Sequence, residues 1–241
     1  MSEEIPKETA KALAPAPARQ ESGAKSLAQQ ALSELRRMII ENELPPGSTH
    51  LEGELANLLK MSRTPVREAA VVLERLGLVE VRPRHGIRIL PVFIKDMEEI
   101  YTLLTELESL AAVIVAEAGL SAAELQPLWD RIAEMEAALA VEDRRAWAEA
   151  DSAFHSQLVA LSGNSRLESV VATFTDQVQR ARYMTLFIRR LPLRSNAEHR
   201  ALVEAIAAGD AERARRIHRD HRIGAKNLMI SLIEQAGFRS A

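Results

Sequence analysis

The chain contains no cysteine among its 241 residues. This absence excludes disulfide frameworks, thiol nucleophiles, thiolate zinc sites and iron–sulfur clusters, so any metal must be held by nitrogen and oxygen ligands. Long apolar runs are also missing, because no stretch approaches the roughly 20 residues of a membrane helix. The N-terminal sequence lacks the apolar core of a signal peptide. We therefore expect a cytoplasmic protein without a membrane partner.

Aromatic residues are scarce at 4%, and the hydrophobic fraction of 47% comes mainly from Leu, Ala, Val and Ile. This composition favours helices packed on helices over a sandwich or a barrel. At roughly 150 residues per domain, the length is typical of two modest domains.

The net charge of −3 argues against a nucleic-acid binder, but the charge is unevenly distributed. Residues 60–90 hold seven basic and three acidic side chains, whereas residues 91–241 hold 18 basic and 22 acidic ones. The positive charge is thus concentrated in one short stretch, which is typical of a local nucleic-acid contact.

The hydrophobic pattern divides the chain into three parts. Residues 1–24 mix charges with Ala and Pro and predict a disordered tail. Residues 25–90 show three short helical patterns and then a period of two around Pro83-Arg84-His85-Gly86, which predicts a winged helix-turn-helix. Residues 91–241 read as an antiparallel helical bundle. Its six predicted helices span about 95–118, 121–140, 143–162, 164–190, 194–208 and 210–237. The predicted fold class is therefore mainly α.

The start of the third helical pattern supplies candidate DNA contacts, which are Ser62, Arg63, Thr64 and Arg67. In a helix-turn-helix the second helix presents its N-terminal residues to base edges, and an arginine fork can bind two acceptors of a guanine. Arg84 and His85 at the tip of the predicted hairpin would contact the backbone or minor groove. Residues 25–90 contain no Phe, Tyr or Trp, which favours duplex DNA over single strands or RNA. A merely solvated helix face is the alternative.

Four histidines lie beyond residue 150, and three of them suggest a metal site. Asp151 and His155 are four residues apart and so share a helix face. His199 and His221, on the last two predicted helices, could complete a set of four ligands. One carboxylate and three imidazoles suit zinc, nickel or manganese. The alternative is that these side chains are polar groups of a surface or core without a metal.

The segment from Leu51 to Leu90 resembles the DNA-binding domain of the GntR family of bacterial transcription regulators. The specific parts are SRTPVREA (62–69), LERLGLV (73–79) and the wing RPRHG (82–86). The resemblance implies a homodimer on palindromic double-stranded operator DNA, with Arg63 and Arg67 near base edges and Thr64 near phosphate. The resemblance also implies DNA contacts by Arg36, His85 and Gly86, but these three positions match the family less specifically. One departure lies at residues 49–53, where the family usually has a more basic run with another arginine.

The C-terminal part resembles the FCD ligand-binding domain of the FadR-type branch of that family. The shared features are Asp151-Ser152-Ala153-Phe154-His155, Gly163-Asn164, Glu198-His199, and Gly209-Asp210 followed by His221. The resemblance implies that Asp151, His155, His199 and His221 ligate a metal, with His218 as a neighbour or a substitute.

The FCD resemblance has one departure at the effector pocket. Leu104 stands where relatives often place an arginine, four residues before Glu108, that faces the effector carboxylate. Arg182 is a candidate replacement, and a surface arginine is the alternative.

Together these features predict a repressor whose operator affinity is controlled by a small carboxylate bound at a metal. The sequence contains neither a nucleophile-and-base motif nor a Gly-rich phosphate loop, and such motifs are what would favour an enzyme. Two alternatives remain at this point: a metal-dependent hydrolase or lyase with an accessory nucleic-acid-binding domain, and a helical scaffold without a ligand.

Overall fold

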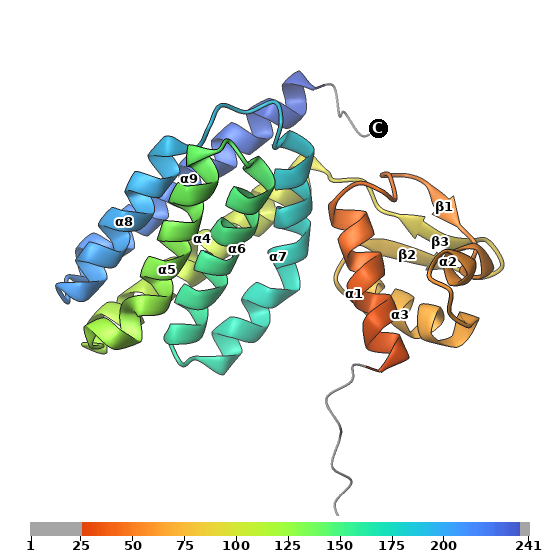
Figure 1. Cartoon of the computed structure of the whole chain (residues 1–241), viewed down its shortest axis with the longest axis horizontal. Helices are drawn as coiled ribbons and strands as arrows, with labels where there is room; N and C mark the ends of the chain where they lie inside the picture. The colour runs from red at the N-terminus through yellow and green to blue at the C-terminus, as the bar shows by residue number, and fades with distance from the viewer. Residues whose placement is uncertain (1–25, 237–241) are drawn as a thin grey trace, which may run out of the picture.

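The computed structural model describes residues 26–236, which form a small N-terminal unit and a larger helical unit (Figure 1). An extended segment at residues 90–93 joins the two. The predicted disordered tail, residues 1–24, lies outside the described residues. Within residues 26–236, no helix is both long and apolar enough to cross a membrane.

The N-terminal unit is a winged helix-turn-helix. Its elements are α1 (Leu27–Ile40), β1 (Thr49–His50), α2 (Glu52–Leu58), α3 (Arg63–Arg75), β2 (Val79–Arg82) and β3 (Gly86–Ile89). The helix α1 begins at a capping box in which the Ser26 hydroxyl accepts from the Gln29 N–H. Its apolar face packs on α3 through a core that includes Leu35, Ile39, Val66 and Leu73.

The three strands form an antiparallel sheet in the order β1-β3-β2. The predicted hairpin is β2 and β3, with Val81 opposite Ile87. Gly86 has φ +90°, and a Cβ there would lie 2.4 Å from the backbone oxygen of His50. Only glycine fits this turn, because β1 approaches it so closely. The strand β1 was not predicted, because two residues are too few to show the alternation of apolar and polar side chains that marks a strand.

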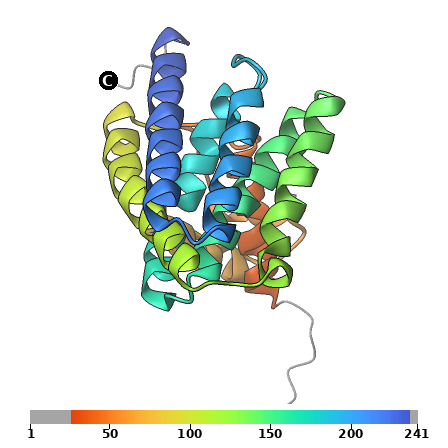
Figure 2. The same ribbon diagram turned by 90° about the vertical axis from the view of Figure 1, so that its left-hand side faces the viewer.

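The C-terminal unit contains six helices within the described range. They are α4 (Ile94–Glu117), α5 (Ala122–Ala140), α6 (Arg144–Leu161), α7 (Ser165–Thr185), α8 (Leu193–Ala207) and α9 (Ala211–Gln235). Figure 2 shows several of them standing side by side. The pair α4 and α9 pack together, as do α5 with α6 and α8 with α9. The mainly α fold class is thus confirmed.

The helix α7 ends at Thr185, five residues before its predicted end. Arg144, at the start of α6, donates from Nη1 to the carbonyl oxygens of Leu186 (3.2 Å) and Arg189 (2.7 Å). A side chain from a distant part of the sequence therefore satisfies carbonyls that a longer helix would have paired internally. The segment 186–192 therefore leaves the helical path after Thr185.

The helix α7 also holds the two units together. Three of its side chains bind the N-terminal unit: Asp176 pairs with Arg36 of α1, Gln177 Nε2 donates to the Leu76 carbonyl (3.0 Å), and Arg180 donates to the Leu90 carbonyl. The Asp176 carboxylate is buried although Arg36 is half exposed.

Candidate metal centre and nucleic-acid interface

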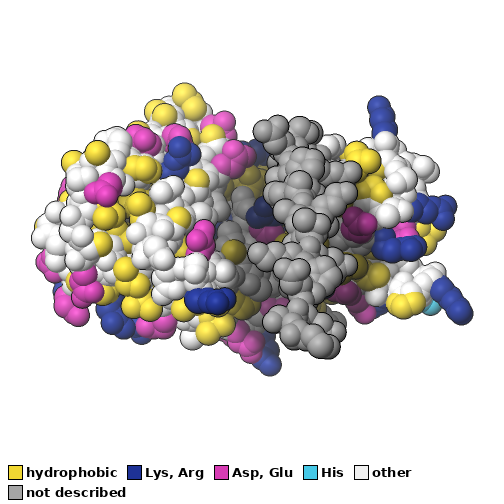
Figure 3. Space-filling view, turned by 90° about the horizontal axis from the view of Figure 1, so that it is seen from below, with side chains coloured by type: hydrophobic (Ala, Val, Ile, Leu, Met, Phe, Trp, Pro, Cys, Tyr) yellow, Lys and Arg dark blue, Asp and Glu magenta, His cyan; other side chains and the backbone are white. Residues whose placement is uncertain are grey.

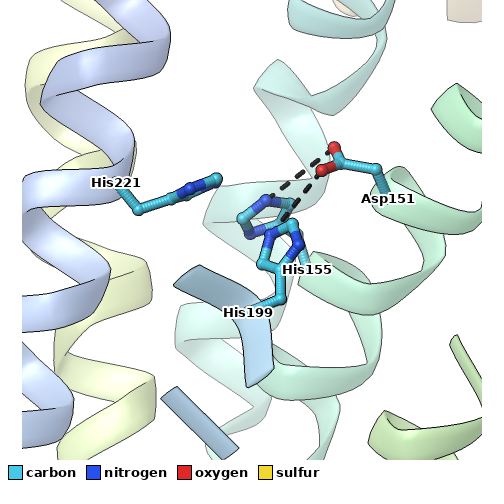
Figure 4. Close-up of side chains that lie close together, drawn as sticks. All are labelled: Asp151, His155, His199 and His221. Carbon is cyan, nitrogen blue, oxygen red and sulfur yellow. Dashed lines mark ion pairs between the residues drawn. The ribbon is translucent and has the colours of Figure 1, made fainter. Parts of the chain in front are cut away.

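Three helices bring the predicted metal ligands together. Asp151 and His155 lie one turn apart on α6, His199 lies on α8 and His221 on α9. All four side chains are buried, and Figure 4 shows them converging from α6, α8 and α9. One ligand atom from each residue lies within 4.8 Å of the others. The four residues singled out from the sequence thus form one cluster.

The imidazole nitrogens that face this cluster have no hydrogen-bond partner among the described residues. Nε2 of His155 is 3.9 Å and Nε2 of His199 is 3.6 Å from the Asp151 carboxylate. These two atoms and Nε2 of His221 are buried without a hydrogen bond. A buried polar atom left unpaired costs about 1–3 kcal/mol. The donor set therefore fits a divalent cation, which would satisfy all three lone pairs at once.

Two glutamates contact the ring nitrogens of His221 and His155 that face away from the cluster. Nδ1 of His221 is hydrogen bonded to Glu198 Oε2 at 2.9 Å, and Nδ1 of His155 lies 3.0 Å from Glu108 Oε2. A carboxylate at Nδ1 favours the ring proton there and leaves the Nε2 lone pair free for a metal. These two glutamates were not predicted as site residues. Glu198 could have been suspected, since it directly precedes His199.

His218 belongs to a neighbouring group. Its Nε2 lies 3.3 Å from Glu108 Oε2, and its Nδ1 is 3.2 Å from the Ser109 hydroxyl. Glu108, His155 and His218 also lie close enough to hold an ion. However, Arg222 Nη2 already lies 3.2 Å from Glu108 Oε1. The structure thus places His218 beside the four-residue cluster, as a neighbour.

The electrostatics favour the protonation states that a metal needs. Burial would raise the pKa of Asp151, but the Arg182 guanidinium and the histidines outweigh it and hold that pKa well below its usual range. Burial lowers the pKa of His155 to about 4, although Glu108 opposes the shift. Burial, and then His221, lower the pKa of His199 well below its usual value. An ionised carboxylate and neutral imidazoles are the forms that bind metals.

The metal-free protein is expected to lose stability as the pH falls from about 6.5 towards 4. The folded-state pKa values of His155, His199 and His218 are all lowered, chiefly by burial. In this window the unfolded chain therefore binds protons that the folded chain cannot. Each histidine contributes a slope of up to about 1.4 kcal/mol per pH unit. Melting curves of chelator-treated protein across this range measure the effect.

The control for this experiment is His85→Asn, because His85 is exposed at the wing. That variant should keep the pH profile of the wild type, whereas His199→Gln should flatten it. A melting temperature that stays constant between these pH values would contradict the expectation.

Arg182, the predicted effector-binding residue, is buried in an ion pair with Asp151. Arg182 and Arg222 line a cavity of about 20 Å³ together with Leu104 and Glu108. Arg222 was not predicted, because nothing in its local sequence marks it. A cavity of this size holds about one water molecule, so it is too small for an organic acid as it stands.

The candidate DNA contacts gather at the far end of the N-terminal unit. Ser62, Arg63, Thr64 and Arg67 are exposed at the start of α3, and Arg84 and His85 are exposed at the wing. A groove lined by Arg63, Arg67, Arg82 and Arg84 runs between α2, α3 and the wing. Figure 3 shows Lys and Arg side chains projecting at this end of the molecule, whereas both charge signs mix over the helical unit.

Two of the predicted DNA-contacting arginines already have carboxylate partners. Arg67 donates from Nε and Nη2 to Glu52 at 2.9 and 2.7 Å, and Arg36 pairs with Asp176 of α7. Arg63 has no such ion pair among the described residues. Its guanidinium lies against Gly53, so closely that a Cβ added to Gly53 would be 3.2 Å from Arg63 Nη2. Neither carboxylate partner was predicted, since both pairs join separate helices.

Two families match this chain. Residues 27–89 match the family described as bacterial regulatory proteins, gntR family. Residues 99–223 match the FCD domain.

Curated relatives match along most of the chain. A helix-turn-helix transcriptional regulator from an unstable DNA locus of Streptomyces ambofaciens is 33% identical over 190 residues, covering 78% of each chain. A probable D-xylose utilization operon transcriptional repressor of Paenarthrobacter nicotinovorans is 32% identical, covering 73% of this chain and 76% of the relative. Among solved structures, E. coli McbR/YncC has the same fold with a TM-score of 0.75 at 21% identity, covering 86% of this chain and 99% of that one.

Proposed function

This chain belongs to the GntR family of bacterial transcription regulators and carries the FCD domain of its FadR-like subfamily, and on that premise we propose that it is a repressor released by a small carboxylate bound at a metal. The family regulates transcription and is not a family of enzymes, so the hydrolase or lyase alternative is set aside. In this proposal residues 25–90 are the DNA-reading domain and residues 91–241 are the effector domain. Repression, rather than activation, is supported by the relative described as a probable operon repressor.

The observation that carries the proposal is the set of three unpaired, buried Nε2 atoms around Asp151. We propose that Asp151, His155, His199 and His221 hold zinc, nickel or manganese. Such an ion would supply a Lewis-acid position for an oxygen of the effector.

Charge balance supports an effector that is an anion. The carboxylates near the cluster are each balanced by a guanidinium, in the pairs Asp151–Arg182, Glu108–Arg222 and Glu198–Arg194. A divalent cation added to this neutral set of six charges makes the site positive. We therefore expect carboxylate binding to depend on the metal.

On the DNA side, we propose that Arg63 and Arg67 contact base edges while Ser62 and Thr64 contact phosphates. Arg84 and His85 would contact the backbone or minor groove from the wing, where Gly86 permits the turn. Arg36 would add a backbone contact only after leaving Asp176. The protein would act in the cytoplasm as a homodimer on a palindromic operator.

The helix α7 physically connects the proposed effector site with the DNA-reading unit. It carries Arg182, which pairs with Asp151, and also Asp176, Gln177 and Arg180, which bind the N-terminal unit. An effector that changes the pairing of Arg182 would act on the helix that positions the DNA-reading unit. Effector binding would thereby shift the population of DNA-binding arrangements.

The test is binding of the purified protein to duplexes from its own promoter region, compared with random duplex, over a range of salt concentrations. We expect a preference for the promoter that weakens as salt rises. Screening small carboxylates by thermal shift, with and without chelator, should find acids that stabilise only the metal-loaded protein and release the DNA. Equal affinity for promoter and random duplex at every salt concentration would overturn the proposal.

A further inference from the structure

One arginine at the start of α3 is held by a carboxylate of the same groove, and its neighbour is not. Arg67 donates from Nε and Nη2 to Oε1 and Oε2 of Glu52, at 2.9 and 2.7 Å. Arg63, one turn earlier on α3, has no direct ion pair among the described residues, although its charge acts on the same glutamate. Glu52 therefore lies within the electrostatic reach of both candidate base contacts.

The position of Glu52 sets it apart from the other acidic residue of the groove. Glu52 belongs to the first turn of α2 and lines the groove between α2, α3 and the wing. Its side chain is 23% exposed, whereas that of Arg67 is 68% exposed. Glu54 also lines the groove, but its Oε2 accepts from the Leu51 N–H at 2.9 Å and so serves the N-terminus of α2. Among the residues that line this groove, Glu52 is the carboxylate paired with a DNA-reading arginine.

The pair removes one positive charge from the groove. The hydrogen bond from Arg67 lowers the pKa of Glu52, burial opposes the shift, and the charges of Arg67 and Arg63 add to it. The carboxylate is therefore ionised at neutral pH. While the pair is intact the two charges cancel, and Arg67 attracts phosphates only weakly.

Glu52 also occupies a hydrogen-bonding edge that DNA could use. Nε–H and Nη2–H point in parallel from one side of a guanidinium, and they match two neighbouring acceptors of a carboxylate, a phosphate or a base. A nucleic acid that binds Arg67 on this edge has to displace Glu52. Exposed ion pairs are weak, so the pair can open when a better partner is offered.

Phosphates and bases differ as competitors for Arg67. A phosphate brings a second negative charge close to the Glu52 carboxylate and is repelled by it. A guanine edge is uncharged and presents two acceptors, so it can take Arg67 without that repulsion. A carboxylate at this position thus penalises contacts that every DNA sequence offers more than contacts that one base pair offers.

We propose that Glu52 is a specificity-determining residue of the DNA-reading unit, whose carboxylate withholds Arg67 from the phosphates of non-operator DNA and releases it to a base edge with two acceptors. The inference rests on the proposed function, in which Arg67 contacts bases. It assigns to α2 a role in discrimination, in addition to the contacts made by α3 and the wing.

The test is Glu52→Gln in the full-length, metal-loaded protein, with binding to promoter and random duplexes measured by fluorescence anisotropy over a range of salt concentrations. Random duplex should bind about five- to tenfold more tightly near 0.1 M salt, because the released Arg67 gains a phosphate contact. The slope of log affinity against log salt concentration should steepen by about 0.9 for that contact. Promoter affinity should rise less, because Arg67 is already released there, so the preference for the promoter falls.

The matched control is Glu68→Gln, which removes the same charge from an exposed position on α3 outside the groove. It should leave the salt dependence and the promoter preference unchanged. A second control places Glu52→Gln in an Arg67→Ala background. There it should not steepen the salt dependence, because Glu52 acts through Arg67. Melting temperatures confirm that each variant is folded.

Three outcomes would overturn the inference. If Glu52→Gln leaves the salt dependence of random-duplex binding as in the wild type, Glu52 does not withhold Arg67 from phosphates. If it weakens promoter binding instead, Glu52 orients Arg67 for the base contact. In both cases a wild type that prefers its promoter leaves the proposed function standing. If the wild type binds promoter and random duplex equally at every salt concentration, the inference and the proposed function both fail.

Discussion

Replacing Asp151 with alanine is expected to lower the free energy of unfolding by about 3–5 kcal/mol. Asp151 and Arg182 form a buried ion pair, so the variant leaves a guanidinium buried without its carboxylate. The same change removes one of the four candidate metal ligands. Chemical denaturation followed by circular dichroism measures the stability, and elemental analysis of the purified variant measures the metal.

Asp220→Ala is the control for this prediction, because Asp220 is an exposed carboxylate on α9. It should change stability by less than about 0.5 kcal/mol and retain the metal. Adding chelator should destabilise the wild type and the Asp220 variant but have little further effect on the Asp151 variant. If the Asp151 variant matches the wild type in both stability and metal content, Asp151 is neither a ligand nor a structural ion-pair partner.

The features that could be predicted from the sequence are those encoded locally. The change of hydrophobic period near Gly77 separated α3 from the wing, because helices and strands differ in their side-chain repeat. The spacing of Asp151 and His155 placed both on one face of α6. His199 and His221 were candidates by residue type alone, and the family resemblance then implied them as ligands, because local rules do not state which helices pack together.

The features that could not be predicted are pairings between distant elements. Glu108 and Arg222 lie on α4 and α9, and only the packing of these two helices brings them together. The early end of α7 depends on Arg144, which satisfies carbonyl groups 42 and 45 residues away. Likewise, the ion pair between Arg182 and Asp151 joins α7 to α6, and the sequence did not predict it. Such contacts are set by tertiary packing, for which a single sequence contains no direct signal.

Replacing Arg63 with alanine is expected to weaken operator binding by about 1–3 kcal/mol per half-site, or about 5- to 150-fold. Arg63 is exposed at the start of α3, and no described carboxylate forms an ion pair with it. Its guanidinium can therefore bind a guanine edge without first breaking a direct ion pair. Arg67 differs, because it must first leave Glu52, so Arg67→Ala should have the smaller effect of the two. Fluorescence anisotropy with promoter and random duplexes measures both.

The comparison of duplexes separates base reading from general charge. Because Arg63 is proposed to contact bases, Arg63→Ala should lose far more affinity for the promoter than for random duplex. Removing a phosphate contact, such as the one proposed for Thr64, should weaken binding to the two duplexes equally. Arg75→Ala removes an exposed arginine from the last turn of the same helix, outside the groove, and should leave promoter preference intact. An equal loss for Arg63→Ala and Arg75→Ala would mean that α3 contributes only diffuse positive charge, and the assignment of its N-terminal end to base reading would be wrong.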